Sequence, residues 1–191
     1  VRYTDLNGKP ATSFEFVYSV LIPMLMFFPA FVAGSMSIDM ITEEVENKTL
    51  QTLLSAPLTV SGMIGAKITS AVTLAIVQCI AWLTLLQMNG IDIQNKAWIL
   101  LLALVVAGIT STSASITAAF LQDRERSQFI FSLLLLAGVS IGTMLNLSPI
   151  TTISRLAVGD AYTSGWHVMV FAAFFSVLYF LLLRTARRLL H

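Results

Sequence analysis

Few side chains in this sequence are able to do chemistry, and their positions argue against a metal or nucleotide site. The two histidines, His167 and His191, lie at opposite ends of one apolar stretch without a cysteine or carboxylate cluster beside either, whereas a zinc site needs several such ligands at close spacing. No Gly-x-x-x-x-Gly-Lys-Ser/Thr loop occurs, so the phosphate-binding loop of P-loop ATPases is missing. We therefore expect this chain to bind no cofactor.

A nucleophilic site has one candidate. Ser140 and His167 lie in successive apolar stretches, and together they would supply a nucleophile and a base for intramembrane proteolysis. The pattern argues against this alternative, because Ser140 is expected well below the membrane surface and His167 near it.

The amino-acid composition indicates that any functional site is carried by membrane-spanning helices. Of the 191 residues, 57% are hydrophobic and only 11% are charged, against about 25% charged in an average soluble domain. Mean hydropathy is +0.84, and the charges leave several uncharged runs near the roughly 20 residues that cross a bilayer. The net charge of +1 includes no basic tract, so nucleic acid is not an expected partner. The sequence predicts an all-α, polytopic membrane helix bundle in a single domain.

The uncharged runs predict five spans after an external segment at 1–15. We place the spans at about 16–40, 63–88, 97–121, 128–145 and 165–183. Small residues four apart, Ala30 with Gly34 and Gly138 with Gly142, predict close packing between these helices.

Lys and Arg residues predict the orientation, because cytoplasmic loops are enriched in them. With the loop at 41–62 in the cytoplasm, that side carries seven basic residues and the other side four. This places the C-terminus in the cytoplasm and the chain in the plasma membrane. The first residue is Val rather than Met and falls outside the cell, so we expect one preceding span and six in all, with a protein of five spans as the alternative.

The most informative segment is ITEEVENKTLQTLLSAP at 41–57. Leu50, Leu53 and Leu54 share one helical face, and Pro57 ends the helix. Asp39, Glu43 and Glu46 would form an acidic stripe that leads into it. These features predict an amphipathic helix at about 42–56, lying along the cytoplasmic interface. Acidic residues suit an anionic leaflet poorly, so a protein partner explains this helix better than lipid or a merely solvated surface does.

This segment resembles the first cytoplasmic segment of type-2 ABC exporter permeases. The resemblance rests on Thr49-Leu50-x-x-Leu53-Leu54-x-x-Pro57 followed by Gly65-x-Lys67, with departures at Lys48, where the family usually has glycine, and at Gln51, where an acidic residue is common. It implies that the helix is the coupling helix that docks on a separate ATPase subunit. The contact residues so implied are Glu43, Glu44, Glu46, Thr49, Leu50, Leu53, Leu54 and Pro57.

A second segment, at about 148–159, is similar to the external re-entrant helix of the same family. Ser148 is a candidate N-cap, Pro149 takes the first helical position and Gly159 follows the end. Ile150, Ile153 and the Leu156-Ala157 pair give one apolar face, so we expect the helix to dip into the outer interface between the fourth and fifth spans. An ordinary capped loop is the alternative. The residues assigned to this element are Ser148, Pro149, Arg155, Gly159 and Asp160.

The resemblance implies a permease subunit that works with a second permease copy, identical or not, and with an ABC ATPase that binds the ATP and Mg²⁺. Spans lined by Leu, Phe, Met, Ser and Thr weakly favour an amphipathic, lipid-like or drug-like substrate over an ion, with membrane lipids as neighbours. A membrane binding or immunity protein without transport stays open as an alternative, because no charge pair inside the spans requires transport.

Overall fold

The computed structural model describes residues 15–46, 60–160 and 165–188, and these residues form helices without any strand. In chain order the elements are η1 (Val17–Leu21, a π-helical turn), α2 (Ile22–Glu46), α4 (Val60–Met88), α5 (Lys96–Leu121), α6 (Arg124–Met144), α7 (Pro149–Val158) and α8 (Gly165–Arg188). Five of these segments are long and apolar enough to cross a membrane: Val17–Glu44, Gly62–Met88, Lys96–Leu121, Arg124–Met144 and Gly165–Arg184. The predicted fold class, an all-α polytopic membrane bundle, is confirmed.

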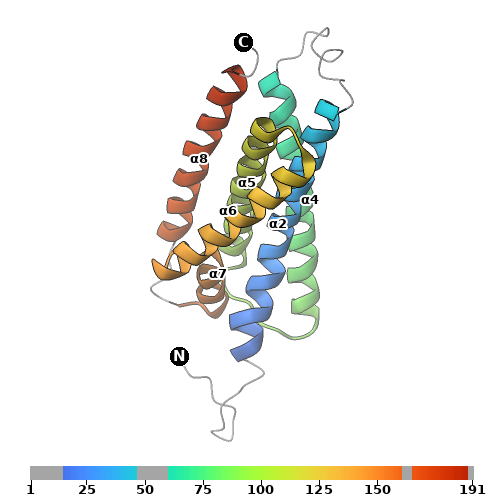
Figure 1. The fold of residues 1–191 in the computed structure, drawn as a ribbon. Helices are drawn as coiled ribbons and strands as arrows, with labels where there is room; N and C mark the ends of the chain where they lie inside the picture. Colours follow the sequence, from blue (N-terminus) through green and yellow to red (C-terminus); the bar gives the residue numbers. More distant parts are fainter. Residues whose placement is uncertain (1–14, 47–59, 161–164, 189–191) are drawn as a thin grey trace, which may run out of the picture.

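Helix α5 is the centre of the bundle. It packs against α2, α4, α6 and α8, and 67% of its most apolar window is buried, against 11% for α6 and for α8. Small residues make this possible, because Ala103, Ala107, Ala114 and Ala118 are nearly inaccessible to solvent and let neighbouring backbones approach closely. In Figure 1, α6 runs obliquely across the bundle, while α8 stands at its edge.

The ends of the helices are set by local backbone chemistry. Asn95 and Gln122 flank α5 in the left-handed conformation, with φ of 51° and 53°. Asp123 caps α6 by accepting a 2.8 Å hydrogen bond from the backbone N–H of Arg126, which satisfies one donor that the first turn leaves free. Pro29 lies inside α2 without ending it, as membrane helices tolerate.

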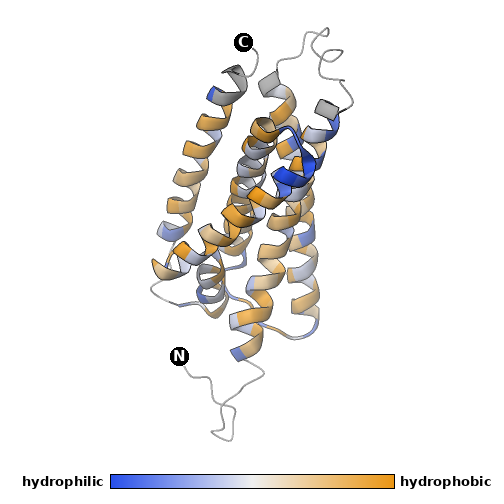
Figure 2. Ribbon diagram, in the orientation of Figure 1, coloured by the Kyte–Doolittle hydropathy of each residue, from blue (hydrophilic) through white to orange (hydrophobic). Residues whose placement is uncertain are grey.

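Hydropathy follows the predicted membrane arrangement. The helices are hydrophobic along most of their length, and hydrophilic residues gather near their ends, most densely at the turn between α5 and α6 (Figure 2). Large apolar side chains stay exposed on outward faces, including Phe28, Val77, Phe129 and Phe180 at 58–64%. Such a surface suits hydrocarbon rather than water.

Candidate functional site: the charged end of the bundle

The end of the bundle where α2 stops and α4 begins carries the first candidate site. Residues 42–46 form the last turns of α2 rather than the start of a separate interfacial helix, so the expected boundaries of the first span and of the coupling helix differ from the structure here. The reason is local: Ile38–Glu46 contains no helix breaker, and the Thr42 hydroxyl donates to the Ile38 carbonyl 2.9 Å away within the helix. Thr49, Leu50, Leu53, Leu54 and Pro57 lie outside the described residues.

Asp39 joins α2 to α6. Its Oδ1 atom accepts hydrogen bonds from Arg124 Nε at 2.8 Å and from Gln128 Nε2 at 2.9 Å. Asp39 was predicted to begin an acidic stripe that leads into the amphipathic helix, and its carboxylate contacts α6 of the same chain. Arg124 and Gln128 were missed as partners.

Glu44 joins α2 to α4. Its Oε1 lies 2.6 Å from Lys67 Nζ, and the two side chains are only 22% and 14% exposed. Lys67 also donates a hydrogen bond to the backbone carbonyl of Met40, so one ammonium group holds two points on the last turns of α2. Glu44 was predicted to face an ATPase; the structure shows it in an ion pair within the chain.

Glu43 has a different environment from its neighbour. It is solvent-exposed at the end of α2. Glu46 is the last residue of α2, and its side chain lies outside the described part of the structure. Of the three predicted acidic contacts, Glu43 is therefore the one that the structure shows at the surface.

The opposite end of the bundle is closed by α7. Ser148 precedes the helix, Pro149 is its first residue and Gly159 follows it with φ of 77°, as the sequence predicted. The Ser148 side chain makes no capping bond, and its buried hydroxyl has no hydrogen-bond partner. Arg155 is exposed and Asp160 is half-buried.

The position of α7 differs from the prediction that it lies between the fourth and fifth spans. Ile153, Leu156 and Ala157 are at most 1% exposed, and α7 packs mainly against α2, η1 and α5. Two bonds tie its end to the turn before α5: Gln94 N–H donates to the Ala157 carbonyl at 3.1 Å, and Asn95 Nδ2 donates to the Leu156 carbonyl at 3.3 Å. The apolar face was identified correctly, but the sequence does not say which helices cover it.

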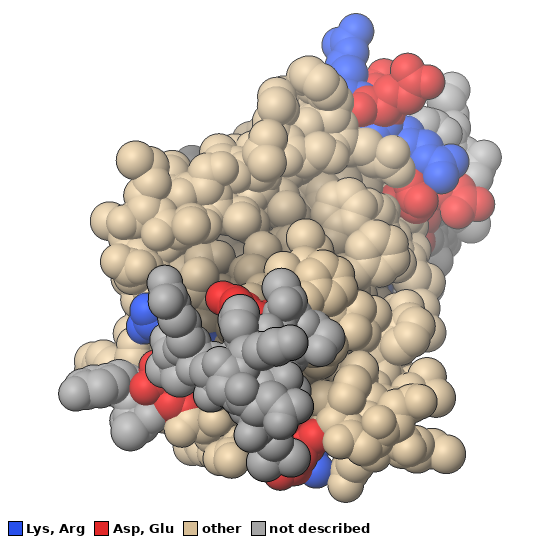
Figure 3. Space-filling view, turned by 90° about the horizontal axis from the view of Figure 1, so that it is seen from below, with Lys and Arg blue, Asp and Glu red and all other residues tan. Residues whose placement is uncertain are grey.

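Charged side chains are also sparse at the end of the bundle seen from below. Figure 3 shows Lys, Arg, Asp and Glu there in separate groups, with uncharged residues covering most of the described surface in view. Among the described residues, no group of three or more His, Cys, Asp and Glu is placed to hold a metal ion. Ser140 is exposed on α6, and the buried Nδ1 of His167 has no hydrogen-bond partner in the described part of the chain. The structure therefore does not support a Ser–His dyad.

The arrangement defines a class: a polytopic α-helical membrane protein with ion-paired helix ends on one side and an amphipathic cap helix on the other. A sequence model of the ABC-2 family transporter proteins matches residues 2–184, and the chain belongs to this family. It is a transmembrane subunit of an ABC transporter and not itself the ATPase. No curated protein and no solved structure matches the chain.

Proposed function

We propose that this subunit exports an amphipathic, lipid-like or drug-like substrate, driven by ATP hydrolysis on a separate ABC ATPase. The ATPase would dock at the end of the bundle that carries segment 47–59, and the chain would work beside a second permease copy, identical or not. ATP and Mg²⁺ would be held by the ATPase alone. On this proposal the docking end and the C-terminus are cytoplasmic, in the plasma membrane.

The observation that carries the proposal is the pair of ion pairs that link the end of α2 to other helices. Asp39 ties the end of α2 to α6, and Glu44 ties it to α4 through Lys67. Segment 47–59 lies between α2 and α4 in the chain, so a force applied to that segment reaches α2, α4 and, through Asp39, α6. Ion pairs and hydrogen bonds between helices are among the contacts that carry energetic coupling between distant sites.

Coupling is also favoured by how loosely α6 and α8 are held. Both helices are mostly exposed within the bundle, and they make almost no contact with each other. Helices with few buried contacts move at a lower free-energy cost than central ones. We infer that α6, which Asp39 ties to the end of α2, transmits the ATPase motion while α5 stays as the fixed centre.

The test is co-purification of the protein with the ATPase of its own operon or gene neighbourhood. We expect the purified chain alone to hydrolyse no ATP, and the complex to hydrolyse ATP at a rate that depends on the permease. Robust ATP turnover by this chain alone would overturn the proposal. So would an ATPase whose binding is unaffected when segment 47–59 is replaced by a Gly/Ser linker of equal length, provided that the replaced chain still inserts and folds.

A further inference from the structure

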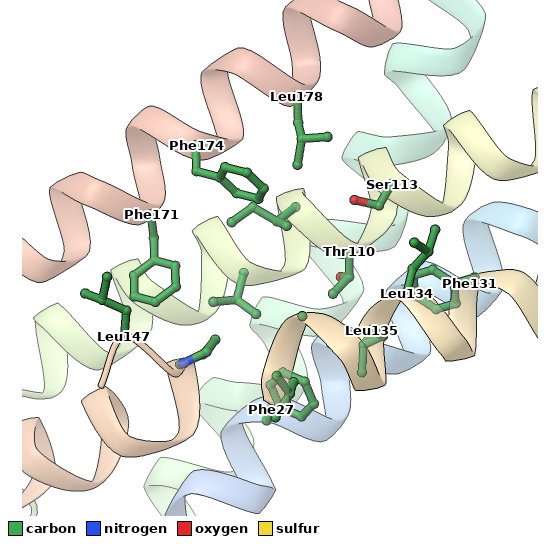
Figure 4. A pocket seen from close by; sticks show the side chains of 15 residues that line it. Phe27, Thr110, Ser113, Phe131, Leu134, Leu135, Leu147, Phe171, Phe174 and Leu178 are labelled. Carbon is green, nitrogen blue, oxygen red and sulfur yellow. The ribbon is translucent and has the colours of Figure 1, made fainter. Parts of the chain in front are cut away.

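A hollow in the described bundle lies between α5, α6 and α8, away from the charged end. Its volume is about 440 Å³, within the roughly 300–1,000 Å³ of small-molecule sites. It exists because α6 and α8 both pack on α5 but hardly touch each other. Figure 4 shows side chains from α8 pointing across the hollow toward α5 and α6.

Each of the three helices contributes one face of about two turns. On α8 the face is Phe171, Phe174 and Leu178, which are spaced i, i+3 and i+7 and so lie on one side of a helix. The faces on α5 and α6 repeat this spacing with an added i+4 position, from Val106 to Ser113 and from Phe131 to Val139, and Phe27 of α2 also lines the hollow. At 1.5 Å per residue each face is about 10 Å long. The hollow is therefore elongated along the helices, and Leu147 and Pro149 border it at the α7 end.

The lining is almost free of hydrogen-bonding groups. No charged residue lines the hollow, and its polar side chains are Thr110 and Ser113. The Thr110 hydroxyl already donates to the backbone carbonyl of Ala30 at 2.6 Å. A polar ligand would lose its hydrogen bonds to water and regain almost none here, and a buried water needs two to four polar partners. The occupant that fits this lining is hydrocarbon.

The hollow opens sideways, toward the face that hydrocarbon surrounds in a membrane. Leu134 and Phe174 line it from opposite helices and are 54% and 55% exposed, whereas Val106 on its floor is 5% exposed. All three residues lie well inside the spans of α6, α8 and α5. An acyl or alkyl chain is thus able to enter between α6 and α8 without leaving the apolar layer.

We propose that this hollow binds one hydrocarbon chain of an amphiphile, which enters between α6 and α8. If the amphiphile is the exported substrate, its hydrocarbon chain is the part that this hollow binds, and this assignment rests on the proposed export function. Binding of a hydrocarbon chain does not depend on export, because all the contacts lie within this subunit.

Gly138 makes a sharp test possible. It lines the hollow, and a Cβ added there would meet nothing within 4 Å. A Cβ at Gly138 therefore forces no backbone movement, in contrast to one at Gly108, which would lie 2.8 Å from Phe175. We expect the ring of Gly138→Phe to occupy the hollow that this position lines. Ser140→Phe is the matched control, because Ser140 is exposed on the same helix and does not line the hollow.

The measurement is photolabelling with a palmitic acid that carries a diazirine in mid-chain, using the purified protein in dioleoylphosphatidylcholine nanodiscs without ATP. We expect label on Val106 and Ile109, on the floor of the hollow, in the parent and in Ser140→Phe, and its loss in Gly138→Phe. Label confined to outward faces, or floor labelling that persists in Gly138→Phe, would overturn the proposal. So would an oxidative cross-link between two copies of a Gly138→Cys variant, because a second copy would then fill the hollow.

The two sources of such a chain are separated by adding the ATPase. If the chain belongs to a transported amphiphile, ATP with Mg²⁺ should lower floor labelling, and a hydrolysis-deficient ATPase should not. If it belongs to a resident bilayer lipid, labelling should not change with ATP; both results support the hydrocarbon site. The pull-down tests ATPase-driven export, and the labelling without ATP tests the hydrocarbon site. A failed pull-down would not change the labelling, and absent labelling would not change the pull-down, so the two proposals fail independently.

Discussion

Arg124 Nε lies 2.8 Å from Oδ1 of Asp39, a residue 85 positions earlier in the chain. The side chains are 57% and 37% exposed, and ion pairs this open contribute about 0–1 kcal/mol to stability. The consequence of this contact is therefore mainly geometric. It fixes the first turn of α6 to the last turns of α2, beside the segment that leads into α4.

Breaking this contact should affect coupling more than folding. We expect Asp39→Lys and Arg124→Asp each to lower transport, with thermal midpoints that fall by no more than about 2–4 °C, the shift for about 1 kcal/mol in a chain of this size. The double variant should recover part of the transport, because the pair is re-formed with its charges exchanged. Asp92→Lys, at the opposite end, is the control. Equal transport by Asp39→Lys and the parent would remove Asp39 from the coupling path.

The Lys67–Glu44 pair should behave differently because it is more buried. Glu44→Ala leaves the Lys67 ammonium without its carboxylate, and an unpaired, largely buried charged group costs about 2 kcal/mol or more. We expect a larger loss of thermal stability than for Asp39→Ala, measured by size-exclusion chromatography after heating. Glu44→Gln with Lys67→Met should lose less than the two single changes added together. A midpoint for Glu44→Ala no lower than that of Asp39→Ala contradicts this ranking.

Close packing of α2 on α6 depends on Gly34. A Cβ added there would lie 2.3 Å from Cζ of Phe131, and Phe131 is 2% exposed and stacked on Phe31 with ring centroids 6.1 Å apart. Gly34→Ala should destabilise the protein by about 1–3 kcal/mol through overpacking. Adding Phe131→Leu should restore part of the loss, and Gly138→Ala should cost far less. Additive effects of Gly34→Ala and Phe131→Leu would show that the two sites do not interact.

The glycines also show where reading the sequence reaches its limit. Four-residue spacing predicted close packing at Gly34 and at Gly138 alike, yet the structure crowds Gly34 and leaves Gly138 beside open space. Spacing places a residue on a helix face but does not say what lies opposite. That depends on the lateral arrangement of the helices, which the sequence does not report.

The spans themselves were readable, because bilayer thickness forces long runs without charge. The contacts of Asp39 and Glu44 could not be predicted, because each partner lies in another helix. An acidic residue looks the same in the sequence whether its side chain faces a neighbouring helix or solvent. The two ends of α7 were predictable for the opposite reason. Ser148, Pro149 and Gly159 set the helix ends through the local backbone, within a few residues of their own positions.

Membrane orientation is tested with cysteines at exposed positions on the two ends. Arg155, on α7, and Arg126, in the first turn of α6, are both exposed, whereas Thr152 and Ser127 are at most 3% exposed and would report burial instead of sidedness. In a background with Cys79 replaced by Ala, Arg155→Cys should react with an impermeant thiol reagent added to intact cells. Arg126→Cys should react only after lysis. The reverse pattern would invert the topology and move the proposed ATPase contact outside the cell.

The last prediction separates an ATPase contact from a solvated helix end. Glu43 is exposed where α2 ends, whereas its neighbour Glu44 is engaged with Lys67. Charge reversal at Glu43 should therefore leave the subunit inserted and folded, because no described contact within the chain depends on it.

If Glu43 meets basic residues of the ATPase, Glu43→Lys should weaken capture of the ATPase at low salt. The difference from the parent should shrink at 0.5 M salt, since screening acts over a few ångströms there and rim charges act mainly through long-range attraction. Asp92→Lys, an equal charge change at the far end, should capture the ATPase like the parent. If Glu43→Lys and Asp92→Lys cannot be told apart in capture and in transport, Glu43 is only a solvated surface residue, and docking must rely on segment 47–59 without it.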